Sequence, residues 1–438
     1  MRTFLAPLLL SLCLTSPATF AEEEEAPDFA DAALSGNWGG QRSTLWQAGW
    51  ALDAALRVDA IHSRGGQKSG AGAMTNLDLR VKADLAKILD WNDATAYLHI
   101  LDNRGAAVNA DYTGSFMGVS SIEVPVAATR IYHAWLQQNF FNDQFSLLAG
   151  IYPIDAEFFV IESAGVFAHP TFGTPGNLAI THGPAIFNNG ALALRAKWLS
   201  KDRTLYGMAA ILDGVPNDPE RPKQTTVKLG DGAFLIGEFG WTPLEYGHSF
   251  EPVEPVDNLP SEMLYRHERY GGVSKYAIGA WRYTSPVADQ FNNDADGQPG
   301  SSHSQGAYVL AERTLFGLDG SGRDVSAFAR YSLSDGRSTP LDRSWNIGLR
   351  VRGPLASRPE DVLALGWVYA RLAPDYRAAQ AAGGNATASS ENVVELTWRA
   401  QFSRYFAIQP LLQSITHPGG SAAAARATVI GARFDLVL

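Results

Sequence analysis

The chain has 438 residues, 46% of them hydrophobic and 18% charged, and its formal net charge is −10. An acidic chain lacks the basic surface that phosphate backbones require, so nucleic acid is not an expected partner. The length suffices for a large core, and single β-barrels often exceed the usual size of a domain.

The first 21 residues resemble a secretory signal peptide, with Arg2 as the charged start, an apolar stretch at 5–14 and a cleavage-like Thr19-Phe20-Ala21. That stretch is too short to cross a membrane as a helix. The single cysteine, Cys13, lies within it, so no disulfide or thiolate site is expected in the mature chain. Removing residues 1–21 takes away one base and no acid, which gives 34 − 45 = −11. We interpret residues 22–48 as an acidic tail and a short periplasmic lead-in.

Residues 49–438 are predicted to form an all-β domain, a transmembrane antiparallel barrel. No run of 18 apolar residues follows Ala21, whereas many segments of about ten residues alternate apolar with polar side chains. In residues 49–62, for example, Leu52 and Leu56 alternate with Asp53 and Arg57. A membrane barrel turns such apolar side chains toward lipid and the polar ones toward its lumen.

The alternation predicts sixteen strands, with boundary errors of a few residues. They are 49–62, 75–87, 93–103, 126–138, 144–153, 190–200, 203–213, 231–242, 270–284, 304–316, 323–333, 343–353, 361–372, 390–402, 405–416 and 426–438. Counted from the periplasm, long outer loops alternate with short inner turns, as in bacterial transmembrane barrels. The connection 243–269 departs from this order, because an inner turn is expected there and it has 27 residues.

The most informative connection is the 36-residue stretch 154–189. Loops of that length are uncommon in compact domains and are usually functional. We expect it to fold into the mouth of the barrel and to constrict the lumen.

Four stretches resemble the carbohydrate-selective porins of the OprB family, found in Gram-negative outer membranes. They are LSGNWGGQRSTLWQAG (34–49), RIYHAWLQQNFF (130–141), FFVIESAGVFAHPTFG (158–173), and residues 392–420 with VVELTWRAQF, IQPLLQ and HPGG. The likeness keeps the family's order over nearly the whole mature chain. Pro170 in the loop and the non-aromatic Leu438 at the end depart from the family's pattern.

This resemblance implies a sixteen-stranded barrel whose lumen is narrowed by inward-folded outer loops. It also implies passive uptake of sugars, usually glucose and related monosaccharides, so the expected partners are neutral sugars and outer-membrane lipid. The nine histidines show no metal-ligand spacing and no nucleophile motif is present, so neither cofactor, metal nor catalysis is expected. Whether the unit is a monomer or a homo-oligomer stays open.

Four candidate substrate contacts lie in the loop: Asp155, Glu157, Phe158 and Glu162. Carboxylates can exchange hydrogen bonds with sugar hydroxyls, and an aromatic ring can pack on the C–H face of a sugar. The alternative interpretation is that the acids pin the loop to basic residues on the wall, while the phenylalanine packs beneath it.

Four further candidates, Arg57, Arg80, Arg350 and Arg399, fall on the phase assigned to the lumen. A lipid-facing arginine near the membrane midplane would cost about 2–4 kcal/mol, which supports that phase. Facing the loop's acids, they would set a transverse field across the constriction. The alternative is that they line a wet wall.

Two other functions remain in play from the sequence. One is a less selective porin that passes anions or small acids along the arginines. The other, more remote, is a barrel enzyme or secreted hydrolase using an acid pair such as Glu157 and Glu162, whose chemistry requires a fixed separation that the sequence does not give.

Overall fold

The computed structural model describes residues 26–216, 220–230, 232–243, 273–294, 296–318 and 322–438. The predicted signal peptide, residues 1–21, lies outside these ranges, and so does the connection 243–269 from residue 244 onward. Among the described residues, no helix is long and apolar enough to cross a membrane.

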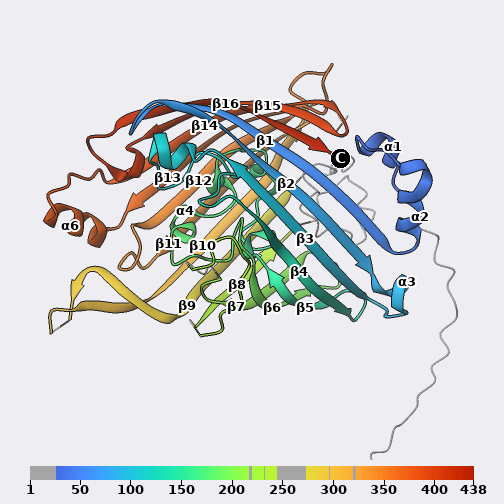
Figure 1. Cartoon of the computed structure of the whole chain (residues 1–438), viewed down its shortest axis with the longest axis horizontal. Helices are drawn as coiled ribbons and strands as arrows, with labels where there is room; N and C mark the ends of the chain where they lie inside the picture. The colour runs from blue at the N-terminus through green and yellow to red at the C-terminus, as the bar shows by residue number, and fades with distance from the viewer. Residues whose placement is uncertain (1–25, 217–219, 231, 244–272, 295, 319–321) are drawn as a thin grey trace, which may run out of the picture.

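The chain forms a closed barrel of sixteen antiparallel strands, each paired with its neighbours in sequence, while the first strand pairs with the last (Figure 1). The strands are β1 (Trp50–Gly66), β2 (Gly70–Asp84), β3 (Ala94–Gly105), β4 (Ala128–Phe140), β5 (Phe145–Tyr152), β6 (Ala191–Leu199), β7 (Leu205–Asp213), β8 (Ala233–Trp241), β9 (Ser274–Asn293), β10 (Pro299–Gly317), β11 (Asp324–Ser334), β12 (Leu341–Arg352), β13 (Val362–Leu372), β14 (Ser390–Ser403), β15 (Phe406–Thr416) and β16 (Ala425–Val437). The predicted number of strands and the all-β class are confirmed.

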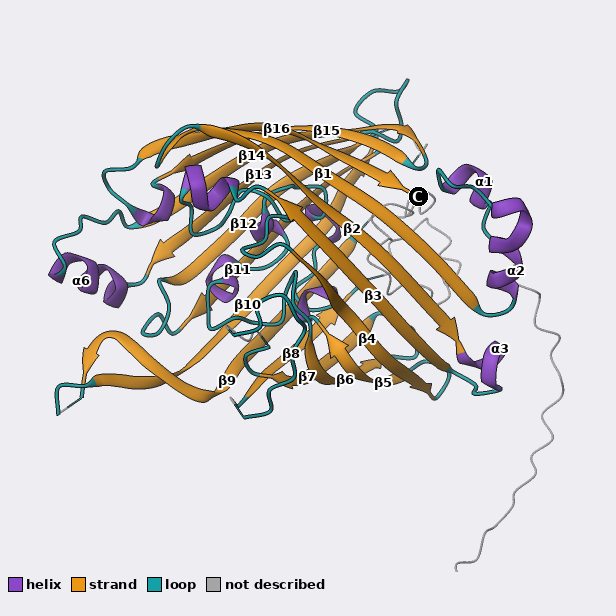
Figure 2. Cartoon of the chain, viewed as in Figure 1, coloured by secondary structure: helices purple, strands orange, loops and turns teal. Residues whose placement is uncertain are grey.

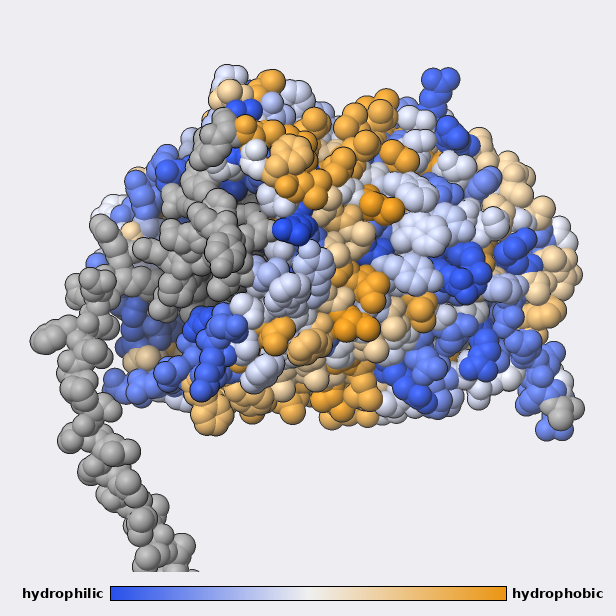
Figure 3. Space-filling model, turned by 180° about the vertical axis from the view of Figure 1, so that it is seen from behind, coloured by the Kyte–Doolittle hydropathy of each residue, from blue (hydrophilic) through white to orange (hydrophobic). Residues whose placement is uncertain are grey.

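The barrel turns its apolar side chains outward, as the alternation predicts. Leu79, Ile211 and Ile278 are exposed on the outer face, at 44%, 48% and 58% of their surface. Asp59 and Glu395, on the opposite phase, are fully buried. Apolar residues gather in a band across the middle of the molecule, with hydrophilic residues on both sides of the band (Figure 3). Such a band is the surface that a bilayer covers.

The two ends of the barrel differ. Helices α1 (Phe29–Ala32), α2 (Gln41–Gln47) and α3 (Leu85–Leu89) lie at one end together with the C-terminus, and α6 (Pro374–Ala382) lies with the long loops at the other (Figures 1 and 2). Short turns mark the periplasmic end of such barrels, and long loops mark the extracellular end. The lead-in to β1 therefore belongs to the periplasmic end.

One side chain ties this lead-in to the seam of the barrel. Arg42, in α2, is 2% exposed. Its guanidinium donates to the carbonyl oxygen of Leu52 at 2.9 Å and to that of Leu438 at 3.5 Å. It also lies 4.6 Å from the ring centroid of Phe29. The Asn-Trp-Gly-Gly turn before α2 thus positions a cation that bridges the first and last strands.

One predicted outer connection is largely strand. We expected strands at 270–284 and 304–316, but β9 continues to Asn293 and β10 begins at Pro299. β9 pairs with β8 only as far as Tyr283, so the rest of β9 and the start of β10 form a two-stranded ribbon (Figure 1). Beyond the barrel wall neither face of a ribbon needs to be apolar, so the alternation that reveals a membrane strand is missing there.

Candidate functional site: the loop-constricted lumen

The connection 154–189 folds against the inner wall of the barrel (Figure 2). It joins β5 to β6 through three short 3-10 turns (Ile154–Ala156, Glu162–Ala164 and Pro170–Phe172) and α4 (Gly176–Ala179). We call it the lumen loop. It meets inward-facing side chains of strands from β8 to β15, so it crosses the space that any solute must traverse.

Three wall carboxylates hold the backbone of the lumen loop. Glu238 of β8 accepts the N–H of Phe159 at 2.7 Å. Glu312 of β10 accepts the N–H groups of Glu162 and Ser163 at 3.0 and 2.9 Å, and Glu395 of β14 accepts those of Ala168 and His169 at 2.8 and 2.9 Å. Sequence reasoning missed these three glutamates. Since hydrogen bonds to a carboxylate are stronger than neutral ones, they fix the path of the loop.

Wall donors hold the loop's carbonyl groups in the same way. Arg330 of β11, 1% exposed, donates to the carbonyl oxygens of Phe159 and Thr171, at 3.1 and 2.5 Å. Gln409 of β15 donates to that of Val166 at 2.6 Å. Buried backbone groups need partners, and here the inner wall supplies both kinds.

Aromatic packing fills the space between the loop and the wall. The rings of Phe167 and Phe172 stack with centroids 3.9 Å apart, over the bare backbone of Gly366 in β13. Phe158 is fully buried in the same apolar cluster. It presents no surface to the lumen, so the structure favours the packing interpretation of Phe158 over its prediction as a sugar platform.

The first half of the loop is anchored through Glu157. Its carboxylate accepts hydrogen bonds from Arg195 Nε at 2.8 Å, Tyr152 Oη at 2.8 Å and Lys197 Nζ at 3.2 Å. Burial alone would raise the pKa of Glu157, but the charges of Arg195 and Lys197 outweigh it and lower the pKa to about 2. Glu157 therefore pins the loop to basic wall residues, as the alternative interpretation anticipated, and does not present a free carboxylate to a sugar.

The other two loop acids have different surroundings. Asp155 accepts the hydroxyl of Tyr132 at 3.0 Å and the N–H of Phe187 at 2.8 Å. Burial raises the pKa of Asp155 to about 6. The side chain of Glu162, by contrast, belongs to an exposed residue, so of the predicted loop acids it is the one that reaches the solvent.

The predicted wall arginines all lie on the inner face, and each faces a carboxylate on the wall. Their ion pairs are Arg57 with Asp435 at 2.6 Å, Arg399 with Asp435 at 3.6 Å, Arg80 with Asp53 and Asp78 at 3.4 and 3.2 Å, and Arg350 with Asp324 at 3.5 Å. Arg57 and Arg399 thus meet at one aspartate, while Arg350 stands apart on β12. The cations that hold Glu157 of the lumen loop are Arg195 and Lys197, not these four arginines.

A second loop, residues 106–127, also folds inward. Ser115 and Ser120 donate to Glu391 at 2.5 Å and to Asp59 at 2.6 Å. The N–H of Ser121 donates to the carbonyl of Ala168 at 2.7 Å, which joins this loop to the lumen loop. Two loops together therefore narrow the lumen.

A closed barrel with an apolar outer band, a charged inner wall and loops folded into its lumen is a porin. More specifically, the chain belongs to the OprB family of carbohydrate-selective porins, whose sequence model matches residues 68–438. Family and fold both point to a channel rather than an enzyme, and they imply the outer membrane.

Individual relatives agree with this assignment. Porin B of Pseudomonas aeruginosa is 23% identical over 449 residues, covering 92% of this chain and 91% of that protein. The high-pH structure of Pseudomonas putida OprB superposes with a TM-score of 0.80 at 19% identity, covering 94% of this chain and all of that one. The outer-membrane channel DcaP of Acinetobacter baumannii gives a TM-score of 0.51 at 12% identity, over 89% and 98% of the two chains. At these sequence identities, the similarity to the two solved structures shows the fold alone.

Proposed function

We propose that the chain passes neutral monosaccharides, glucose and related sugars, by passive diffusion past the lumen loop. The observation that carries the proposal is the pairing of charges on the inner wall. Each of the four predicted wall arginines lies within 3.6 Å of an aspartate on the wall.

The arginine–aspartate pairs are expected to bind anions less well than neutral sugars. An anion that binds one of these arginines must compete with a fixed carboxylate, so the less selective anion pore gains no support from the wall. A neutral sugar can donate to the carboxylate and accept from the guanidinium, and so replace the water that it leaves behind. Passage also requires weak contacts that release the solute.

Three accessible side chains are our proposed sugar contacts. The side chains of Arg57 and Lys197 retain 25% and 26% exposure, and Glu162 is exposed. Arg80, Arg350 and Arg399 are more buried, at 4%, 14% and 10%, and in this proposal they shape the wall.

The remote hydrolase alternative is not supported by the acid pair. Hydrolases of both kinds need one carboxyl group as the acid and a second that reaches the substrate or a water molecule. Arg195 and Lys197 lower the pKa of Glu157 to about 2, against the effect of burial, so Glu157 is not the acid. Its side chain is 8% exposed and already accepts from Arg195, Tyr152 and Lys197, so it is not open to act as the second group. A channel with sugar contacts remains the function that the geometry supports best.

Single-channel recording in planar bilayers tests the proposal. Glucose should reduce the ion current in a saturable way, and Arg57→Ala or Glu162→Gln should raise the half-saturating glucose concentration severalfold. Arg64→Gln, an exposed arginine on the outward phase of β1, is the matched control and should leave it unchanged. If gluconate saturates the channel and glucose does not, the anion pore replaces the sugar pore.

A further inference from the structure

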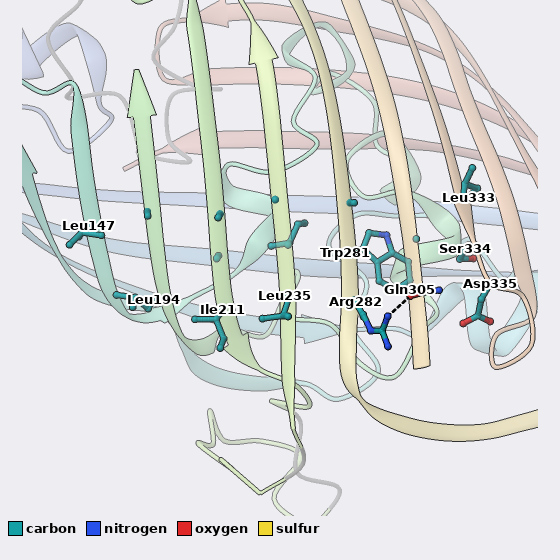
Figure 4. A pocket seen from close by; sticks show the side chains of 17 residues that line it. Leu147, Leu194, Ile211, Leu235, Trp281, Arg282, Gln305, Leu333, Ser334 and Asp335 are labelled. Atoms are coloured by element: carbon teal, nitrogen blue, oxygen red, sulfur yellow. Dashed lines mark hydrogen bonds between the residues drawn. The ribbon is translucent and has the colours of Figure 1, made fainter. Parts of the chain in front are cut away.

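A shallow groove of 850 Å³ lies on the outer, membrane-facing side of the barrel wall, over strands from β5 to β11 (Figure 4). Leu194, Ile211 and Leu235 project into it from successive strands, and they are 50%, 48% and 38% exposed. The groove is separate from the lumen and takes no part in the proposed passage of sugars.

The floor of the groove is a row of small residues in register. Ala196 pairs with Ala209, Ala209 with Gly237, Gly237 with Ala280, and Ala280 with Ala307, across β6 to β10. Larger side chains flank this row on both sides. Leu194, Ile211 and Leu235 lie two residues away in one direction, and Trp198, Phe239, Ile278 and Val309 lie two residues away in the other, where Gly207 of β7 leaves a gap. Strands lie about 4.8 Å apart, so the row is roughly 19 Å long, and the part that lines the groove, from Ala196 to Ala280, is roughly 14 Å long. A long, narrow, apolar channel of this kind matches an extended acyl chain.

A cation stands on the flank of the groove that lies nearer the long loops, in line with Leu235. Arg282 of β9 pairs with Leu235, two residues from the start of β8. Its Nη1 donates to Gln305 Oε1 at 3.0 Å, the contact drawn as a dashed line in Figure 4. Among the described residues Arg282 makes no ion pair, and it is exposed. Its remaining N–H groups are available to an outside acceptor.

The chemistry around Arg282 indicates what kind of molecule would bind in the groove. An arginine on the lipid side of a barrel is costly unless it reaches the interface or a counter-charge. Guanidinium groups bind phosphate oxygens in a bidentate way. The long-loop end of a barrel faces outward, so the phosphate would belong to a lipid of the outer leaflet.

We propose that the groove binds one phosphate-bearing glycolipid of the outer leaflet, with an acyl chain on the small-residue floor and a phosphate at Arg282. A second copy of this chain fits less well. The one carboxylate among the lining residues is that of Asp335, whose Oδ1 accepts the N–H groups of Arg337 and Ser338 at 2.7 and 3.4 Å and whose Oδ2 is buried. A copy packed here would therefore bury Arg282 without a new counter-charge.

Native mass spectrometry of the detergent-purified full chain provides the test, with hexa-acylated diphosphoryl lipid A as the probe. Acyl-matched lipid A without phosphate and phosphatidylglycerol serve as the comparison lipids. We expect one lipid A per chain and at least a fivefold smaller bound fraction for Arg282→Gln. Arg64→Gln removes an outward arginine on the opposite part of the wall and should bind as the wild type does.

A second variant tests the floor without changing charge. Ala280→Phe fills the groove and should reduce lipid A binding as strongly as Arg282→Gln does, whereas Ala60→Phe, on the outer face of β1, should not. Equal binding of the phosphate-free lipid, or of phosphatidylglycerol, would overturn the assignment. So would an Ala280→Phe variant that keeps lipid A but changes oligomeric mass, since the groove would then be an interface between copies.

Discussion

Replacing Glu157 by glutamine tests how the lumen loop is held. In the structure the carboxylate binds Arg195 and Lys197 and is 8% exposed. A pKa near 2 rather than the ordinary 4.5 corresponds to a preference of about 3 kcal/mol for the charged form. Breaking a buried ion pair at one partner typically costs about 3–5 kcal/mol. The pKa shift and this typical cost therefore give the same order of magnitude for the stabilisation.

The assay is amide hydrogen exchange of the purified porin at neutral pH. Loss of about 3 kcal/mol from local opening should speed exchange in residues 154–189 by about a hundredfold, with little change in the strands. The stabilisation is fully present above the unfolded pKa of about 4.5 and is lost as the pH falls toward 2, because the lowered folded pKa favours the charged form.

Glu162→Gln is the matched control, since it removes the same charge from an exposed residue of the same loop. Because contacts of an exposed charge are screened by solvent, it should change the exchange rates of residues 154–189 far less than Glu157→Gln does. Equal exchange in wild type and Glu157→Gln, or faster exchange spread evenly over the barrel, would refute the idea that this ion pair anchors the loop.

Three further outcomes follow from buried contacts elsewhere. Because burial raises the pKa of Asp155 to about 6, protection of the lumen loop, corrected for intrinsic exchange, should fall as the pH rises from about 4 to about 6; Asp155→Asn should remove that dependence. A Cβ at Gly366 would lie 2.5 Å from a loop phenylalanine ring, so Gly366→Ala should lower the unfolding free energy by about 1–3 kcal/mol in urea titration, whereas Gly207→Ala on the outer face should not. Arg42→Ala should lower the unfolding free energy by about 2 kcal/mol, because the carbonyl group of Leu438 loses its hydrogen-bond donor. The measurement is the temperature at which heating shifts the mobility of the barrel on gels, which should fall.

The barrel itself is predictable from the sequence because every strand that crosses the membrane turns apolar side chains toward lipid and polar ones toward the lumen. Arg57 and Arg399 could be placed inside from their phase alone, and the structure has both on the inner wall. This alternation is lost in strand segments that extend beyond the membrane. Residues 285–303 contain Pro286 and Pro299 and alternate poorly, so the pattern predicts a loop there, although most of them lie in β9 and β10 above the rim.

The site was predictable in outline and not in detail. Length and composition predict the lumen loop, and the pinning of its acids to basic wall residues is one of the two interpretations that the sequence allows. The wall glutamates were missed because their partners are backbone N–H groups, which every residue except proline carries. One signal was present: Glu395 stands between Gly366 and Gln413 on neighbouring strands, and neither is a cation. Gln413 donates to Glu395 at 3.1 Å, and the remaining acceptor capacity of this inward carboxylate is open to groups in the lumen.

The most direct test of a sugar-selective lumen is the swelling of liposomes that carry the purified porin. The rates for glucose, a disaccharide and an amino acid of similar size to glucose would be compared, with Arg57→Ala and Glu162→Gln beside the wild type. Our account predicts that glucose enters much faster than the amino acid, and that both variants narrow the difference. Entry rates ordered by size alone, unchanged in the variants, would contradict it.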